Sequence, residues 1–316
     1  MYRFLYITIF FLIIALPLKA QENLVPNGSF EEYNNCPSGG GISWVKNWYS
    51  PTLGSPDYYN VCATNSQLGV PQNGRGYQMP KTGDAYAGFY VRANSNNREY
   101  LQVELAQPLK EGKKYTVHFY LSLSDIDEIS IWNIGMYFSN LAIYSSTFAV
   151  FAPNLTPQIL NEEGNYLNWE EWIEVKGEYM AQGGEKFITI GNFKDNANTD
   201  TLFISGLNQS NPNLTYVFID DVSITEVICE SIFPNVFTPN NDGINENWQP
   251  KLCLDDDEQV NIIVYNRWGQ KVYEAVNKDA FWDGKTTSGT DVSEGSYYYI
   301  ITTKKETYKG TIQLLR

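Results

Sequence analysis

The segment Tyr115-Thr116-Val117-His118-Phe119-Tyr120-Leu121 places an apolar residue at every second position. A period of two is typical of a β-strand with one face in the core and the other toward solvent. Segments rich in β-branched and aromatic residues recur between groups of Gly, Pro, Asn and Asp, and helical periodicity is limited to a weak turn around residues 158–163. The sequence therefore predicts an all-β protein.

The strand-like segments before residue 227 suffice for a complete domain. They are residues 85–91, 100–105, 114–123, 131–138, 172–180, 186–193 and 216–227. Such a series within about 200 residues is typical of a two-sheet sandwich. The Asn-, Gly-, Ser- and Pro-rich segment from Cys36 to Gly83 also contains Trp and Tyr, so we expect a large ordered loop there.

A domain boundary is predicted near residues 227–232, where a new strand series begins. Its strand-like segments are residues 259–265, 271–275, 296–303 and 307–315. This series predicts a compact second β-sandwich of immunoglobulin-like size. We therefore expect one domain over residues 21–227 and another over residues 228–316.

The first 20 residues have the layout of a secretory signal peptide. Arg3 precedes an almost wholly apolar run from Phe4 to Leu18, and Ala20 provides a small residue before the expected cleavage point. The run is shorter than the roughly 20 residues of a transmembrane helix. No later segment has the length and apolar character of a span, so we expect a secreted chain without a transmembrane segment.

Charge and cysteine content narrow the class of protein further. The formal net charge is −14, and an acidic surface repels phosphate backbones, so nucleic acid is not an expected partner. The four cysteines are Cys36, Cys62, Cys229 and Cys253. An even number in an exported chain favours disulfides, paired by proximity as Cys36–Cys62 and Cys229–Cys253. The alternative, a zinc site, lacks the close Cys or Cys/His spacing that zinc requires.

Five ordered sequence blocks mark the second domain. They are FTPNNDGINE (237–246), VYNRWGQKVY (264–273), FWDG (281–284), GSYYY (295–299) and KGTIQLLR (309–316). Together they resemble the gliding motility-associated C-terminal domain, a type IX secretion sorting domain of Bacteroidetes. The resemblance implies export across the outer membrane to the cell surface or extracellular space, with the type IX machinery as partner. The motif positions are Phe237, Pro239, Asn240, Asp242, Gly243, Arg267, Trp268, Gly269, Trp282, Asp283 and Gly284.

These motif residues also have a structural interpretation. Asn-Asp-Gly and Trp-Asp-Gly sequences form turns, and the residues around Arg267 and Gly269 predict a tight hairpin. For Trp268 and Trp282 we favour packing over direct receptor contact. Asp242 and its Asn neighbours suit calcium or turn hydrogen bonds, and the absence of an EF-hand pattern favours the turn.

Two short motifs bracket the first domain. Residues 24–31 (LVPNGSFE) and 218–224 (FIDDVSI), with 109–117 (LKEGKKYTV) between them, resemble strands of carbohydrate-binding, galactose-binding-like jelly rolls. The resemblance implies a jelly-roll β-sandwich whose terminal strands hold a structural calcium. Strict alternation would place Asp220 on the same face as Phe218, Val222 and Ile224. Glu31, Asp220 and Asp221 are the candidate ligands, and the alternative is carboxylates that only accept backbone hydrogen bonds.

A sugar-binding site needs aromatic platforms beside amides and carboxylates. The candidates in the long loop are Trp44, Trp48, Tyr58 and Tyr59. The alternative for each is ordinary packing in the core.

No catalytic constellation stands out in the sequence. His118 is the only histidine and lies within a strand pattern, and no G-x-S-x-G motif is present. We therefore predict a non-catalytic protein without a catalytic cofactor, whose first domain binds glycans or acts in adhesion. The alternative is a structural surface or matrix component with no small ligand. A glycoside-active enzyme, which needs only two suitably placed carboxylates, is the third possibility.

Overall fold

The computed structural model describes residues 21–151, 155–204, 214–254 and 259–316. The chain forms two compact units, one that ends at Val227 and one over Ile228–Arg316. The signal peptide predicted for residues 1–20 lies outside the described residues.

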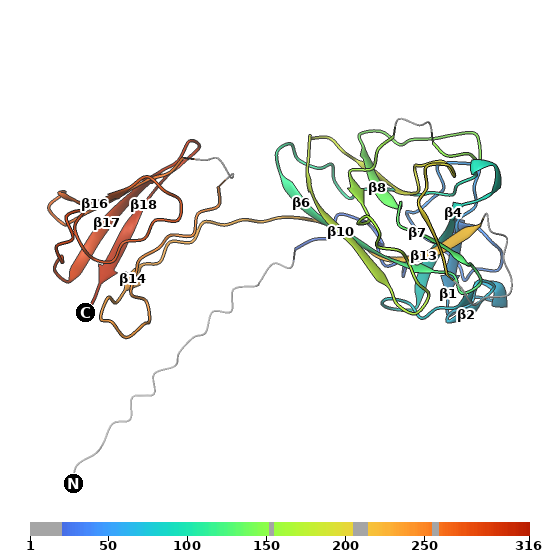
Figure 1. Ribbon diagram of the computed structural model, residues 1–316, viewed down its shortest axis with the longest axis horizontal. Coiled ribbons are helices and arrows are strands. Elements are labelled where there is room, and N and C mark those ends of the chain that lie inside the picture. Colours follow the sequence, from blue (N-terminus) through green and yellow to red (C-terminus); the bar gives the residue numbers. More distant parts are fainter. Residues whose placement is uncertain (1–20, 152–154, 205–213, 255–258) are drawn as a thin grey trace, which may run out of the picture. The chain divides into compact units, whose positions relative to one another are not determined.

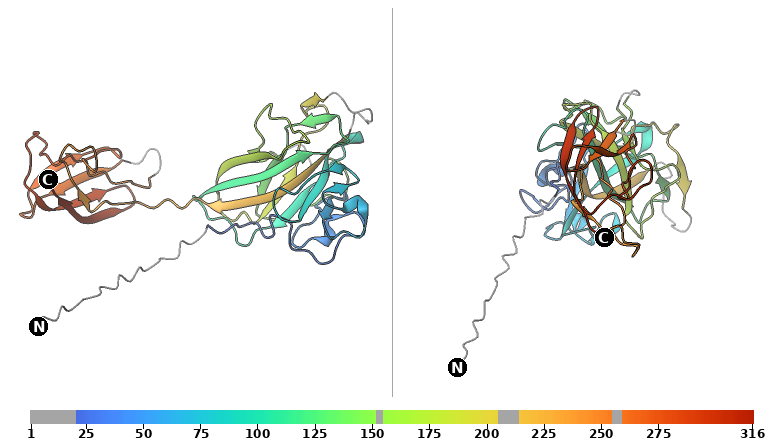
Figure 2. Two further views of the ribbon diagram at one scale, coloured as in Figure 1. Left: turned by 90° about the horizontal axis from the view of Figure 1, so that it is seen from below. Right: turned by 90° about the vertical axis from the view of Figure 1, so that its left-hand side faces the viewer.

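The larger sheet of the first unit is antiparallel and has five strands. Their order across the sheet is β1 (Asp57–Asn60), β4 (Ala85–Arg92), β13 (Thr215–Glu226), β6 (Lys114–Leu123) and β10 (Ile173–Met180). The long strand β13, close to the end of the unit, therefore occupies the centre of the sheet. Figure 2 shows β4, β13 and β6 side by side.

A four-stranded antiparallel sheet forms the second layer of this unit. It runs β5 (Leu101–Glu104), β11 (Phe187–Gly191), β8 (Gly135–Ser139) and β9 (Ile159–Leu160). Two further pairs are β7 (Ile129–Ile131) with β12 (Thr201–Phe203), and β2 (Gln72–Asn73) with β3 (Gly76–Tyr77). The described helices are short 3₁₀ turns, η1 (Ile42–Trp44), η2 (Ser66–Leu68) and η3 (Asn94–Asn96).

One hydrophobic core lies between these two sheets. The larger sheet contributes Phe89, Phe119 and Val217, and the smaller sheet contributes Val103 and Ile188. In β6, the alternating residues of the predicted strand enter this core, while the residues between them face outward. The all-β class and the sandwich architecture are confirmed.

The structure differs from the sequence prediction in several short regions. The strand predicted over residues 131–138 is divided into β7 and β8, and the weak helical turn around residues 158–163 is strand β9 instead. The loop between Cys36 and Gly83 contains β1, β2 and β3. Strands of two to four residues leave too short a pattern for periodicity to identify.

The second unit is built on one five-stranded sheet (Figure 1). Its order is β14 (Val236–Phe237), β18 (Thr307–Leu314), β17 (Gly295–Thr302), β15 (Asn261–Tyr265) and β16 (Lys271–Ala275). β14 and β18 are parallel, and the other neighbours are antiparallel. Strand β16 has the predicted bounds, and β15, β17 and β18 lie close to theirs.

The core of this unit is closed by irregular segments rather than by a second sheet of named strands. Trp248 and Trp282 exchange backbone hydrogen bonds of 2.8 Å, and both indoles are fully buried against Tyr299 and Tyr297. Within the described residues, loops therefore form the second layer of the immunoglobulin-like arrangement expected from the sequence. Large aromatic side chains fill the volume that a second sheet would otherwise cover.

Both predicted disulfides are present. Cys36 bonds to Cys62 in the first unit, and Cys229 bonds to Cys253 in the second. Each bond therefore stays within one unit.

In the part of the chain that the structure describes, no helix combines the length and the apolar character that crossing a membrane requires.

Candidate functional site

The face of the larger sheet that points away from the sandwich core, here called the outer face, is unusually aromatic. Tyr59, Tyr86, Tyr216 and Phe218 form a second buried cluster there. Tyr86 and Phe218 contact edge to face with centroids 5.1 Å apart, and Tyr59 stacks on Tyr86 with centroids 5.2 Å apart. This cluster explains why so many aromatic residues recur in the strand sequences.

A segment over residues 62–83, here called the strap, covers the aromatic cluster of the outer face. Its Leu68 packs on the aromatic cluster. The Gln78 side chain accepts a 2.7 Å hydrogen bond from the Ser122 hydroxyl, and the Met79 carbonyl accepts one of 2.9 Å from the Trp172 indole. The Cys36–Cys62 disulfide fixes the beginning of the strap. The long loop of the sequence is therefore a cover for the sheet.

The aromatic residues predicted as sugar platforms mostly belong to the interior. Trp48, Tyr58 and Tyr59 are each at most 3% exposed, so their ring faces are closed to a ligand. The hydroxyl of Tyr58 donates to the Phe30 carbonyl, and the Trp48 indole donates to the Asn27 carbonyl. Trp44 is half-buried and packs against the same core. The stacking role predicted for Trp48, Tyr58 and Tyr59 does not fit their burial, because the loop that carries them folds inward. For the half-buried Trp44, the stacking role stays a prediction.

Where the strap ends, a cleft of about 550 Å³ opens beside strands β6 and β13. We call it the terminal-strand cleft, because the two motifs that bracket the domain form its walls. It is lined by Asn23, Val25, Asn27, Gly28, Ser29, Glu31, Glu32, Thr82, His118, Tyr120, Asp221, Val222 and Ser223. His118 and Tyr120, the outward-facing residues of β6, provide its aromatic floor.

Backbone contacts join the two bracketing motifs. The Val222 N–H donates a 2.9 Å hydrogen bond to the Gly28 carbonyl, and the Leu24 N–H donates one of 2.8 Å to the Ile224 carbonyl. A Cβ atom at Gly28 would lie 2.0 Å from the Val222 carbonyl oxygen, so only glycine permits this approach. The resemblance identified motifs that are far apart in sequence and adjacent in the fold.

A β-bulge interrupts β13 at the cleft. Asp220 pairs with Tyr120 and Ser223 pairs with His118, so three steps along β13 match two along β6. Asp221 takes up the extra residue with a positive φ of 49°. As a result Asp220 lies with Phe218, while Val222 and Ile224 point into the sandwich core. The strict alternation assumed from the sequence is wrong here, because a bulge reverses the faces after it.

Backbone donors surround the Asp220 carboxylate, which is fully buried. One oxygen accepts the N–H groups of Lys81 and Thr82 at 2.9 and 3.2 Å, and the other accepts the N–H of Asp221 at 2.7 Å. Burial, reinforced by the charge of Asp221, raises the pKa of Asp220 to about 8.

Glu31 has a similar environment closer to the surface. One of its oxygens accepts the N–H groups of Asp84 and Ala85 at 2.9 and 3.0 Å. Burial raises its pKa as well, with a smaller contribution from the charges of Asp84 and Asp221.

These hydrogen bonds fit the alternative to calcium binding, in which the carboxylates only accept hydrogen bonds from the backbone. Calcium takes 6–8 oxygen ligands, whereas three N–H donors already occupy the Asp220 carboxylate. Within the described ranges, no three His, Cys, Asp or Glu side chains are grouped so as to hold a metal ion. Asp220 therefore does not need a cation for its own burial, and calcium bound by Glu31, Asp220 and Asp221 stays a prediction.

The exposed part of the cleft combines an aromatic ring with hydrogen-bonding groups. The Tyr120 hydroxyl donates to Glu174 at 3.1 Å, and the Lys81 ammonium lies 4.4 Å from the centre of the Tyr120 ring. The Thr82 hydroxyl donates to Asp221 at 2.7 Å. Tyr120 and Thr82 are not among the binding residues predicted from the sequence, although the alternation in β6 places Tyr120 on the outward face.

In the second unit, the first motif block forms a hydrogen-bonded loop. The Asn240 side chain accepts the N–H of Asp242, and Asp242 accepts the N–H of Ile244 at 2.8 Å. Asn241 has a φ of 64° and Gly243 one of 85°, conformations that Asn and Gly tolerate best. Turn hydrogen bonding, which the sequence favoured over calcium, accounts for these side chains, while Phe237 is buried in the core.

The two motif tryptophans have opposite environments. Trp282 is fully buried and its indole donates to the Lys285 carbonyl at 2.7 Å, whereas Trp268 is 76% exposed at the tip of the β15–β16 hairpin. The packing role predicted for both therefore fits Trp282 only. Trp268 and the neighbouring Arg267 are exposed because the Asn266–Gln270 turn carries them beyond the sheet.

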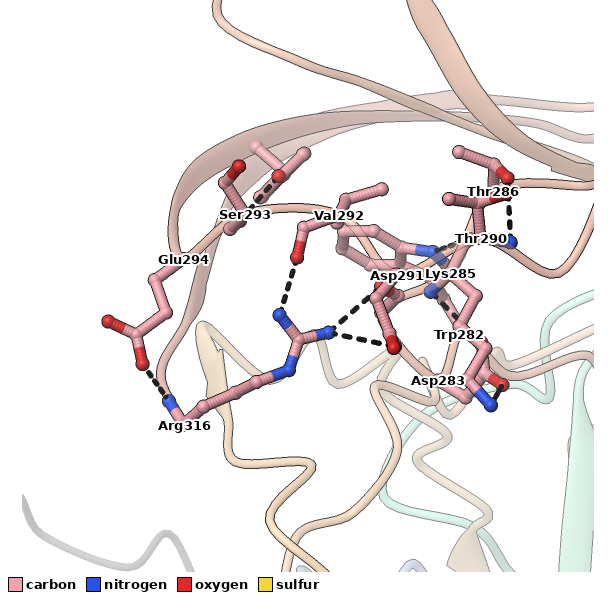
Figure 3. A network of polar contacts seen from close by, with 12 residues as sticks. Trp282, Asp283, Lys285, Thr286, Thr290, Asp291, Val292, Ser293, Glu294 and Arg316 are labelled. Atoms are coloured by element: carbon pink, nitrogen blue, oxygen red, sulfur yellow. Dashed lines mark hydrogen bonds and ion pairs between the residues drawn. The ribbon is translucent and has the colours of Figure 1, made fainter.

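Arg316 connects the last motif block to the Trp-Asp-Gly turn (Figure 3). Its guanidinium donates to the carbonyls of Val292 and Gly284 and lies 3.3 Å from the Asp291 carboxylate. The backbone N–H of Arg316 donates to Glu294 at 2.6 Å. Blocks that are separate in the sequence are thus held together at one edge of the sheet.

Comparison with protein families identifies the second unit. Residues 231–314 match the model of the CHU_C type IX secretion signal domain. The match confirms the resemblance of the five blocks and supports export across the outer membrane to the cell surface or extracellular space. No curated protein matches the chain.

Several solved structures match the chain at low identity and low TM-score. The CBM22-1 xylan-binding domain of Paenibacillus barcinonensis Xyn10C is 11% identical, with a TM-score of 0.35, and covers 67% of this chain and 99% of its own. The K1 cleaved adhesin domain of Lys-gingipain from Porphyromonas gingivalis W83 is 13% identical, with a TM-score of 0.32 and coverages of 61% and 98%. The adhesin domain of Epf from Streptococcus pyogenes is 12% identical, with a TM-score of 0.28 and coverages of 88% and 84%. At these TM-scores the likenesses give no information on the ligand.

Proposed function

We propose that this chain is a non-catalytic binding protein whose first unit recognises a neutral glycan and whose second unit directs its export. The terminal-strand cleft is the observation that supports the binding role. Its partly exposed Tyr120 lies among the side chains of Asn27, Glu32, Thr82 and Asp221. An aromatic surface beside amide, hydroxyl and carboxylate groups matches the alternating apolar faces and hydroxyl groups of a sugar ring.

The charge of the cleft selects the class of glycan. Glu31, Glu32 and Asp221 are among its lining residues. Two cations lie beside the cleft: Lys46 is paired with Glu32 at 3.8 Å, and the Lys81 ammonium lies over the Tyr120 ring, so carboxylates outnumber ammonium groups. Carboxylates accept hydrogen bonds from sugar hydroxyls, but they repel the uronic-acid or sulfate groups of anionic polysaccharides. A neutral glycan is therefore the expected ligand.

We also propose that the first unit binds its glycan without hydrolysing it. The disulfides remove all four cysteines as nucleophiles. His118 lies in the floor of the cleft with Tyr120 as its ring neighbour, 6.0 Å between centroids. Hydrolysis of any neutral polysaccharide that binds the protein would contradict this part of the proposal.

A glycan array followed by calorimetry on the purified chain tests the binding role. We expect binding of a neutral glycan, no binding of uronic-acid polymers, and about a tenfold loss of affinity in Tyr120→Ala, as expected when a central aromatic contact is removed. Tyr144→Ala is the matched control, because Tyr144 is 71% exposed and lies outside the cleft. Equal affinities of the two variants would contradict the assignment of the cleft.

A structural role without a small ligand is the second candidate. The burial of Trp48, Tyr58 and Tyr59 favours it, because these aromatic residues serve the core. If no glycan on a broad array binds the unchanged chain, the structural role replaces the proposed binding role.

The export role is tested by truncation after Val227, which removes the second unit. We expect the truncated chain to accumulate in the periplasm of the natural host. Its display at the surface at the level of the full chain would contradict export through the second unit.

A further inference from the structure

The tip of the β15–β16 hairpin presents a large aromatic side chain to solvent. Trp268 is 76% exposed, whereas Trp248 and Trp282 of the same unit are fully buried. An exposed indole on a small domain is unusual, because its burial would be strongly favourable. Trp and Arg are also the residues most enriched at the energetic centres of protein interfaces.

The backbone of this tip is fixed before any partner binds. The Asn266 side-chain oxygen accepts the N–H groups of Trp268 and Gln270, both at 3.0 Å. The Asn266 carbonyl accepts the N–H of Gly269 at 2.9 Å, and Gly269 has a φ of 75°. Because the turn is already ordered, a partner that binds Trp268 would lose little binding energy to ordering the loop.

The surroundings of Trp268 extend this surface to other motif blocks. The Arg267 guanidinium lies 5.3 Å from the Trp268 ring centre. A recess of about 130 Å³ separates the tip from residues 293–297 and is lined by Trp268, Glu294 and Tyr297. Glu294 in turn accepts the backbone N–H of Arg316. The hairpin block, the GSYYY block and the last block thus share one surface.

We propose that Arg267 and Trp268 form the contact through which a protein of the type IX export machinery docks the second unit. This inference rests on the proposed export function. The domain that contains the tip matches a secretion signal, and a signal in folded form is read through exposed side chains on a fixed backbone. The geometry fits a partner surface with an apolar slot for the indole and a carboxylate at its rim for Arg267.

The test uses the full chain expressed in its natural host. Surface protein is measured by protease treatment of intact cells, and retained protein is measured in the periplasmic fraction. Trp268→Ala should lower the surface fraction about tenfold, the effect of removing one interface anchor. Val276→Ala is the matched control, because Val276 is 72% exposed in the same unit and lies outside the five motif blocks. This control should be exported like the unchanged chain.

Two further variants separate docking from folding. Trp268→Phe keeps an aromatic side chain and should retain most of the export. Arg267→Glu reverses one exposed charge and should reduce export while the melting temperature of the purified chain stays unchanged. If Trp268→Ala lowers the melting temperature, the Arg267→Glu variant decides the question.

The outcomes distinguish the inference from the function on which it rests. Retention of the truncated chain together with normal export of Trp268→Ala and Arg267→Glu overturns the docking contact and leaves the export role in place. Surface display of the truncated chain overturns both. If Trp268 instead binds a membrane or stacks on a glycan, the Trp268→Ala and Arg267→Glu variants should be exported normally. Normal export of both variants therefore contradicts the docking contact.

Discussion

At the scale of single residues, Asp220 is the most informative acidic group. Its carboxylate is buried at a β-bulge, accepts three backbone N–H groups, and has a pKa raised to about 8 by burial and by Asp221. The unfolded chain ionises the same group near pH 4. The folded state therefore binds a proton that the unfolded state has lost throughout the interval between these pKa values.

The sign of the pH dependence follows from this difference. The contribution of Asp220 to the free energy of unfolding is fully present below about pH 4 and is lost as the pH rises toward about 8. Asp220→Asn should lower the stability overall, because its amide cannot accept all three N–H groups, and should flatten the pH dependence. Thermal melts of both proteins across this range provide the measurement. Parallel pH curves would show that Asp220 does not titrate in the fold.

Bound calcium would raise the melting temperature that these thermal melts measure. If Glu31, Asp220 and Asp221 bind calcium, a chelator should lower the melting temperature, because a ligand bound only by the native state stabilises it. The effect should grow as the pH rises toward and above about 8, because Asp220 must lose its proton before it can bind the ion. An unchanged melting temperature in chelator, with no metal found by elemental analysis, would show that the backbone donors suffice.

Trp48 provides a second test at this scale. It is 3% exposed in the main core, so Trp48→Ala should reduce the free energy of unfolding by about 3–5 kcal/mol. Tyr144→Ala, at a residue 71% exposed, should stay within about 0.5 kcal/mol of the unchanged chain. Chemical denaturation provides both values. A Trp48→Ala variant of normal stability and reduced glycan binding would restore the platform role.

At the scale of elements, the contact between the first segment and β13 organises the cleft. Gly28 permits the approach of the two backbones, since a Cβ there would lie 2.0 Å from the Val222 carbonyl oxygen. Gly28→Ala should therefore destabilise the first unit by about 1–3 kcal/mol, the usual cost of overpacking. Gly39→Ala is the control, because no atom lies within 4 Å of its added Cβ. Equal thermal stability of the two variants would contradict this account of the motif.

The disulfides act at the same scale. Cys36–Cys62 closes a separation of 26 residues and fixes the beginning of the strap. Replacing both cysteines by serine should cost about 2–5 kcal/mol of stability. Non-reducing peptide mapping should recover Cys36–Cys62 and Cys229–Cys253 as linked peptides. Free thiols in the exported protein would contradict the pairing.

Long strands could be predicted from the sequence far better than the β-bulge or the packing of the loops. The alternation in residues 115–121 identified β6, because apolar and polar residues alternate along a strand that has one buried and one exposed face. The bulge at Asp221 has no such signature, and it reversed the faces of Val222 and Ile224. Trp48 and Tyr58 have the composition of a sugar site but lie in a loop that folds inward. Tyr120 was missed because its role depends on where the strap ends, and contacts far apart in sequence decide that position.

At the scale of the whole molecule, the two units have separate cores and separate disulfides. Phe89 and Phe119 belong to the core of the first unit, and Trp248 and Trp282 to that of the second. A unit with its own core can serve as a transferable signal. We therefore propose that ligand binding belongs to the first unit and export to the second, so that each function is separable by experiment.

The sufficiency of the second unit for export is the most direct test of this division. Residues 21–227 are replaced by an unrelated folded reporter, while residues 1–20 and 228–316 are kept, and the natural host is treated with protease as intact cells. The account predicts that the reporter reaches the surface and becomes sensitive to protease, whereas a version that ends after the reporter stays protected in the periplasm. Equal protection of both versions, in cells that export the full chain, would contradict the assignment of residues 228–316 as the export signal.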